Sequence, residues 1–190
     1  MTRKSADKPE KVERARGKTN ETVRRSAPLA HLDAAGEARM VDVGMKPVTQ
    51  RRAVASARVT MSASVLERLA SGDAAKGDVL AAARIAGIQA AKRTPELIPL
   101  CHTLALTRVE IAFDLERATT SVRVRATAHA IDRTGVEMEA MVAASIAALT
   151  IYDMLKSADR WMTIDVVRLE EKSGGRSGDQ KRGAGGSSSA

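Results

Sequence analysis

The middle of the chain begins with a strand pattern that changes into helical patterns. Residues 51–61 contain Val, Ala and Thr in strand-like alternation, which predicts a strand with one buried face. A short helix is predicted over residues 65–69, ending at Ser71-Gly72-Asp73. Residues 76–93 predict a second, alanine-rich helix, in which apolar residues recur at helical spacing: Val79, Ala83, Ala86 and Ala90.

The rest of the pattern predicts a loop, a hairpin, a helix and a last strand. Pro95 and Pro99 predict a loop that runs through residues 100–102. Residues 109–113 and 122–126 alternate apolar with charged or small residues, which is typical of a hairpin with one buried face.

A third helix is predicted from near Gly135 to about Ser157, with Thr134 and Glu137 as its capping box. Met162, Ile164 and Val166 then alternate in a final strand. The order strand, helix, helix, strand, strand, helix, strand predicts an α+β fold with helices packed on one face of an antiparallel sheet. Within that class we prefer a ferredoxin-like arrangement.

The charge of the chain is concentrated at its ends. The formal net charge is +8, of which residues 1–28 carry nine basic and four acidic residues and residues 173–190 carry three and one. The remaining 19 basic and 18 acidic residues leave residues 29–172 close to neutral. We therefore expect a disordered basic arm (1–28), a single catalytic domain (29–172) and a flexible Gly/Ser tail (173–190).

Composition narrows the class of protein further. With 44% hydrophobic residues the chain can bury a core, but only three residues are aromatic, so Ala, Val, Leu, Ile and Met must build it. A single cysteine excludes an intramolecular disulfide and fits a reducing compartment. No apolar run or secretory signal suggests a membrane, and we expect a cytoplasmic protein.

Charged residues interrupt an apolar stripe on the third predicted helix. Val142, Ile146 and Leu149 follow helical spacing, and the same spacing leads to Glu139 in one direction and to Asp153 and Lys156 in the other. Isolated charges on a buried stripe are costly unless they are paired or line a site. The alternative is that the stripe reaches solvent and that Asp153 and Lys156 form an ordinary surface pair.

Other candidate residues are individually ambiguous. Lys76 precedes a helix whose N-terminal N–H groups attract anions, although an ordinary solvated lysine is more frequent. Cys101 and His102 are adjacent, but no second Cys/His cluster accompanies them, so no metal site is expected. Arg51, at the start of a strand, can meet a phosphate or only water.

Taken together, several blocks of sequence resemble the cyclic pyranopterin monophosphate synthase family (MoaC) of molybdenum cofactor biosynthesis. The blocks occur in the family's order over residues 30–179: 31–43, 76–79, 83–94, 97–102, 134–140, 147–154 and 172–178. Two positions depart from the usual family pattern, Thr103 in place of Pro and Arg133 in place of Lys. Neither departure touches the lysines named above or Asp153.

The resemblance implies a ferredoxin-like lyase without a cofactor. Its substrate would be 3′,8-cyclo-7,8-dihydro-GTP supplied by a radical SAM enzyme, and its products cyclic pyranopterin monophosphate and pyrophosphate. It also implies a homohexamer, a trimer of dimers with the site at a dimer interface. By resemblance, the acid/base centre is Asp153 and Lys156, with Lys76 the second essential lysine. The implied substrate-binding residues are Leu100, Cys101, His102, Glu137, Met138, Glu139, Arg51 and Lys172.

Two other readings stay open. A pI near 10.1 and an α+β sheet also fit a basic nucleic-acid-binding module, although three aromatics not interleaved with basic residues offer no base-stacking platform. We therefore expect no nucleic-acid partner. A catalytically inactive scaffold of the same fold is the third possibility.

Overall fold

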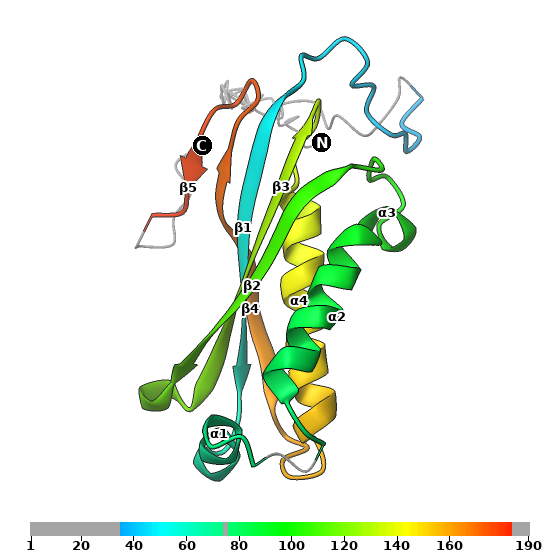
Figure 1. The fold of residues 1–190 in the computed structure, drawn as a ribbon. Coiled ribbons are helices and arrows are strands. Elements are labelled where there is room, and N and C mark those ends of the chain that lie inside the picture. The colour runs from blue at the N-terminus through cyan, green and yellow to red at the C-terminus, as the bar shows by residue number, and fades with distance from the viewer. Residues whose placement is uncertain (1–34, 74–75, 184–190) are drawn as a thin grey trace, which may run out of the picture. The chain divides into compact units, whose positions relative to one another are not determined.

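A computed structural model describes residues 35–73 and 76–183 of the chain (Figure 1). The predicted basic arm, residues 1–28, and the end of the predicted tail lie outside this range. The long strands are β1 (Thr49–Thr60), β2 (Leu106–Glu116), β3 (Ser121–Asp132) and β4 (Thr163–Ser173), and β5 (Gln180–Lys181) is short. The helices are α1 (Ala63–Ala70), α2 (Val79–Lys92), α3 (Thr94–Leu97) and α4 (Glu137–Leu155), with a 3-10 turn at Arg117–Thr119.

The five strands form one antiparallel sheet in the order β2-β3-β1-β4-β5. In this order β3 lies between β1 and β2, and β1 lies between β3 and β4, so the chain crosses over one strand twice. Helix α2 lies in the crossover from β1 to β2, and α4 in the crossover from β3 to β4. Figure 1 shows these two helices side by side on one face of the sheet. This is the β-α-β-β-α-β arrangement, so the α+β, ferredoxin-like prediction is confirmed.

Small residues let the two layers approach closely. On β1 the helix-facing positions are Ala53, Ala55, Ala57 and Val59, and all are at most 1% exposed. Where α2 crosses α4, a Cβ on Gly87 would lie 2.9 Å from the carbonyl oxygen of Ala143. The core therefore depends on alanine and glycine faces rather than on aromatic rings, as the composition predicted.

Three local predictions were wrong at element ends. Pro95 lies in the first turn of the short helix α3 instead of in a loop, a position where its missing N–H costs nothing. Helix α2 begins at Val79 behind the N-cap Asp78, whose carboxylate accepts from the Ala81 N–H at 2.9 Å. Helix α4 begins at Glu137 behind the N-cap Val136, so the predicted capping box of Thr134 and Glu137 does not form, and Glu137 pairs with Lys172 instead.

The segment predicted as a flexible tail contributes to the sheet. After β4 ends at Ser173, a glycine-rich turn leads into β5, which pairs antiparallel with β4. The register joins Glu171 to Lys181 and Lys172 to Gln180. The edge of the sheet therefore extends past the predicted domain boundary at residue 172.

Helix α4 is apolar on more than one face. Its deeply buried face consists mainly of alanine, together with Ile151 and Leu155. The predicted stripe lies beside that face and becomes more exposed along the helix. Val142 is 9% exposed, Ile146 is half-buried and Leu149 is 51% exposed. By length and composition α4 is apolar enough to cross a membrane, but it is the central core helix of this fold.

Candidate active site

The C-terminal end of α4 carries a cluster of two lysines around one carboxylate. Asp153 and Lys156 lie three residues apart, and Lys156 Nζ is 2.7 Å from Asp153 Oδ1. Lys76, from the segment before α2, places its Nζ 3.5 Å from Asp153 Oδ2 and donates to the Asp153 carbonyl at 2.9 Å. The structure thus brings together the three residues that the resemblance implied as catalytic.

The charges of this lysine cluster stabilise one another. The Lys156 ammonium, and then Lys76, holds the pKa of Asp153 below its ordinary value. The hydrogen bond to Asp153 raises the pKa of Lys156. A lysine acts as a base near neutral pH only when its pKa falls, so in this arrangement Lys156 is a cation and a potential proton donor.

The N-terminal end of α4 carries a second, more enclosed cluster. Glu137 pairs with Lys172 at 3.1 Å, and both side chains are mostly buried. Glu139 is only 3% exposed, and burial raises its pKa to about 7, with a smaller contribution from the Glu137 charge. Burial, and then the Glu139 charge, raises the pKa of the nearby Cys101 thiol.

The loop after α3 places three of the predicted substrate-binding residues near this acidic end of α4. Leu100, Cys101 and His102 are all half-buried, as is Met138 on α4. The Nε2 atom of His102 lies 2.8 Å from the carbonyl oxygen of Val41, which ties the segment before β1 to the loop. Val41 lies in the block 31–43 that carries the resemblance, but its contact could not be predicted because only its backbone oxygen takes part.

Arg51 is held rigidly beside the same end of α4. Its Nε donates to the Asp132 carbonyl at 3.2 Å and its Nη2 to the Arg133 carbonyl at 3.0 Å. Gly174 and Gly175 adopt φ of +88° and +75°, and a Cβ on Gly175 would collide with the Arg51 guanidinium. Neither glycine was among the predicted site residues, although two adjacent glycines after the last predicted strand were a usable signal.

The predicted site residues therefore form two groups within one chain. Glu137 and Asp153 are 16 residues apart on one helix, which corresponds to about 24 Å at 1.5 Å per residue. The lysine cluster lies at one end of α4, and Glu137, Glu139, Cys101, His102, Arg51 and Lys172 lie toward the other. One small-molecule substrate cannot contact both groups of the same chain.

Neither group is arranged as a metal centre. Within residues 35–73 and 76–183, no set of three or more His, Cys, Asp or Glu side chains could hold a metal ion. The chemistry available is that of ammonium and guanidinium cations, carboxyl groups and one imidazole.

Comparison with known proteins points to one family. The model of the MoaC family matches residues 40–175. A Roseiflexus protein named cyclic pyranopterin monophosphate synthase is 60% identical over 151 residues, which cover 80% of this chain and 96% of the relative. Relatives of the same name from Thermomicrobium roseum (56% over 156 residues, 82% and 94%) and Brucella ovis (54% over 154 residues, 81% and 93%) match similarly.

Proposed function

The chain belongs to the MoaC family, and we propose that it is a cyclic pyranopterin monophosphate synthase. In this proposal it acts in molybdenum cofactor biosynthesis, in the cytoplasm, as a lyase. It converts 3′,8-cyclo-7,8-dihydro-GTP, supplied by a radical SAM enzyme, into cyclic pyranopterin monophosphate and pyrophosphate. The observation that carries the proposal is the contact of Lys76 and Lys156 with Asp153.

The lysine cluster suits the phosphate part of this reaction. Two ammonium groups share one carboxylate, so the cluster keeps a net positive charge that attracts a triphosphate. The raised pKa of Lys156 keeps that side chain protonated and able to donate a proton to a leaving oxygen. Asp153 holds both ammonium groups in place through its two oxygens.

The acidic end of α4 suits the purine-derived ring. Carboxylate oxygens accept from the N–H groups of a guanine-type ring, and Glu137 and Glu139 lie two residues apart. With a pKa of about 7, Glu139 takes up or releases a proton near neutral pH. Arg51 and Lys172, beside this end, complete the substrate-binding set as phosphate contacts.

The proposal includes a site shared between two copies of the chain. The two residue groups are about 24 Å apart along α4, and a two-fold axis across α4 would bring one end of each helix beside the opposite end of its partner. The outward sides of α2 and α4 offer apolar contacts, since Ile85 is 58% and Leu149 51% exposed. This arrangement fits a dimer within a hexamer built as a trimer of dimers.

The first experiment measures pyrophosphate release from 3′,8-cyclo-7,8-dihydro-GTP. We expect release by the parent and a loss of about 10²-fold or more in kcat/KM for Lys156→Ala, because general acid catalysis typically contributes that much. Lys46→Ala, which removes an exposed lysine from the segment before β1, is the matched control and should behave as the parent. No release by a folded parent would refute the proposed reaction.

Mixing two inactive variants tests the shared site separately. In a dimer of Lys156→Ala with Glu139→Gln, one of the two sites combines the intact halves of both chains. Half of randomly mixed dimers are mixed pairs, so about a quarter of the parent activity should return. Each variant refolded alone should stay inactive, and an equally inactive mixture would show that both groups act within one chain.

A further inference from the structure

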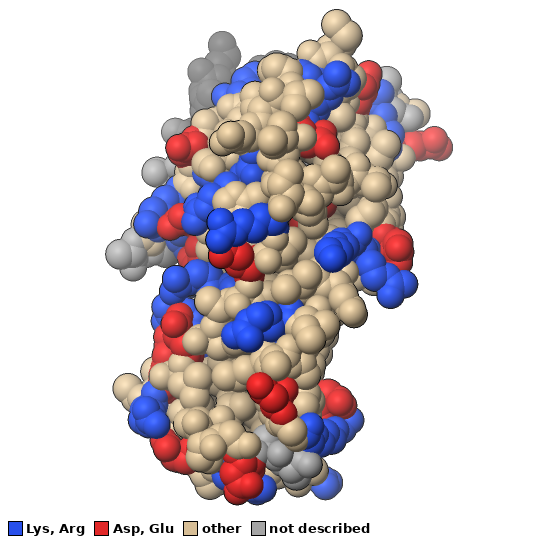
Figure 2. Space-filling model, viewed as in Figure 1, with Lys and Arg blue, Asp and Glu red and all other residues tan. Residues whose placement is uncertain are grey.

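The face of the sheet opposite α2 and α4 is covered by charged side chains. Basic and acidic residues are interspersed over the strands (Figure 2). Phe113 packs toward the core, Tyr152 lies on α4 and Trp161 follows α4, so this face carries none of the three aromatic residues. The face therefore lacks the stacking platform of a single-strand nucleic-acid binder.

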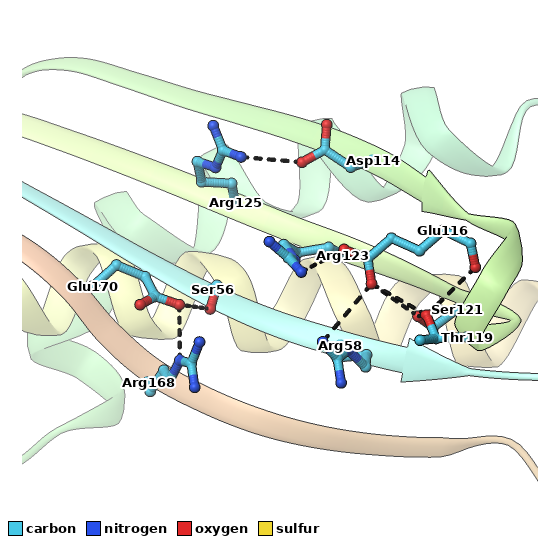
Figure 3. A network of polar contacts seen from close by, with 10 residues as sticks. All are labelled: Ser56, Arg58, Asp114, Glu116, Thr119, Ser121, Arg123, Arg125, Arg168 and Glu170. Carbon is cyan, nitrogen blue, oxygen red and sulfur yellow. Dashed lines mark hydrogen bonds and ion pairs between the residues drawn. The ribbon is translucent and has the colours of Figure 1, made fainter. Parts of the chain in front are cut away.

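A hollow lies over the central strand β1. Its floor is formed by the short side chains of Val54 and Ser56, which are 4% and 5% exposed. Ser56 pairs in register with Arg125 of β3 on one side and with Arg168 of β4 on the other. Figure 3 shows these two arginines on either side of β1. Since neighbouring strands are about 4.8 Å apart, two long cationic side chains flank a short one.

Cations outnumber carboxylates in this hollow. It has a volume of about 280 Å³, and its charged lining residues are Arg52, Arg123, Arg125, Arg168, Lys181 and Arg182 with Glu170 and Glu171. Six cations and two carboxylates leave a net charge of +4. At roughly 30 Å³ per water molecule, the space holds about nine waters, enough for a small anion.

The carboxylates in the hollow are already engaged. Glu170 Oε1 accepts from Ser56 at 2.5 Å and from Arg168 at 2.8 Å. Glu171 contacts Arg52 at 3.0 Å through Oε2 and Lys181 at 2.9 Å through Oε1. Each of these two carboxylates is therefore already paired with at least two donors.

Arg123 and Arg125 have N–H donors that are not used by the carboxylates they contact. Arg125 reaches Asp114, and Arg123 reaches Glu116, through a single nitrogen each. A guanidinium has five N–H donors, so most of theirs have no protein acceptor in the described part of the chain. Beside the hollow, the Nε of Arg58 is buried with no hydrogen-bond partner among the described residues. On this face of the sheet, the arginine N–H donors therefore outnumber the hydrogen-bond acceptors that contact them.

We propose that this hollow over β1 binds a small polyphosphate anion, at a site separate from the lysine cluster on α4. Guanidinium groups recognise phosphate oxygens in pairs, which suits the unused donors of Arg123, Arg125 and Arg168. The basic residues follow two successive rows along β1, with Arg125 and Arg168 beside Ser56 and Arg123 beside Arg58, about 7 Å apart. A chain of phosphates reaches both rows, whereas a single phosphate reaches one.

Calorimetric titration with inorganic tripolyphosphate tests the site in the full-length, assembled protein. The Lys76→Ala/Lys156→Ala double variant serves as the background, because it removes the cations of the lysine cluster. We expect one tripolyphosphate per chain to bind to this background. Adding Arg125→Ala and Arg168→Ala should weaken binding about tenfold or more, whereas Arg93→Ala, an exposed arginine at the end of α2, should not change it.

Three further arms complete the test. Arg125→Lys with Arg168→Lys keeps the charge and guards against misfolding, and it should weaken binding less than the alanine pair. GTP binding as tightly as tripolyphosphate would show that the phosphate chain alone is recognised. Absence of tripolyphosphate binding to the lysine-free background would overturn the proposal, as would tight binding of a random single-stranded oligonucleotide without tripolyphosphate binding.

Discussion

Glu139 makes the stability of the protein depend on pH in a direction that differs from that of most carboxylates. Its side chain is 3% exposed at the start of α4, and burial raises its pKa from the ordinary 4.5 to about 7. The folded state therefore holds a proton on Glu139 at pH values where the unfolded chain has released it. The informative substitution is Glu139→Gln, which keeps the shape and removes the ionisation.

The magnitude follows from the difference between the two pKa values. A shift from 4.5 to about 7 at 1.36 kcal/mol per pKa unit corresponds to about 3 kcal/mol. Because the folded-state pKa is the higher one, this stability is fully present below pH 4.5 and is lost as the pH rises through about 7. Above that range the parent carries a buried carboxylate and Glu139→Gln does not.

Urea unfolding at one fixed protein concentration measures the effect, since assembly makes stability depend on concentration. Between about pH 4 and pH 8, the free energy of unfolding of Glu139→Gln should rise relative to that of the parent by about 3 kcal/mol. Glu96→Gln, which alters an exposed carboxylate paired with Arg93, is the control and should show no such rise. A difference between Glu139→Gln and parent that stays constant with pH would refute the assignment of a raised pKa.

Three further outcomes are expected. Gly87→Val should lower the urea-unfolding free energy by about 2 kcal/mol, because its Cβ would lie 2.9 Å from the Ala143 carbonyl oxygen where α2 crosses α4. Gly175→Ala should raise the KM for 3′,8-cyclo-7,8-dihydro-GTP more than it lowers kcat, because the added Cβ displaces the Arg51 guanidinium. Asp153→Asn should abolish pyrophosphate release while the melting temperature stays within a few degrees of the parent's, since exposed ion pairs contribute little to stability.

The fold could be predicted because most strands bury one face only. On β3, Val122, Val124 and Ala126 are fully buried, whereas Arg123 and Arg125 point to the open side, so the sequence itself shows the alternation. Right-handed crossovers and short connections leave only a few possible orders of sheet neighbours. The strand–helix order therefore predicted the α+β class, and the ferredoxin-like arrangement was our preference within that class.

Helix ends and helix faces were harder to predict from sequence. The apolar residues of α4 surround most of its circumference, so a periodicity argument chose Val142, Ile146 and Leu149 over the alanine face that fills the core. The predicted capping box is absent because α4 begins at Glu137 with Val136 at the N-cap, so Thr134 and Glu137 are not at the N-cap and N3 positions. Glu137 instead pairs with Lys172, 35 residues away in sequence. Such a contact depends on the register of β4 against β1, which local patterns do not encode.

Helix α4 connects the fold to the proposed chemistry through its length and its two apolar sides. A helix that is apolar nearly all round is normally buried all round, yet Leu149 is half exposed and Ile146 only half-buried in this chain. The same helix separates the lysine cluster from Glu137 by about 24 Å, too far for one substrate. A second copy packed against α4 would cover the exposed apolar side and supply the missing half of each site. A single dimer contact would therefore account both for the exposed apolar residues and for the separation of the two residue groups. The charged ends of α4 that looked costly on a buried stripe are then explained by their position at the two ends of an interface.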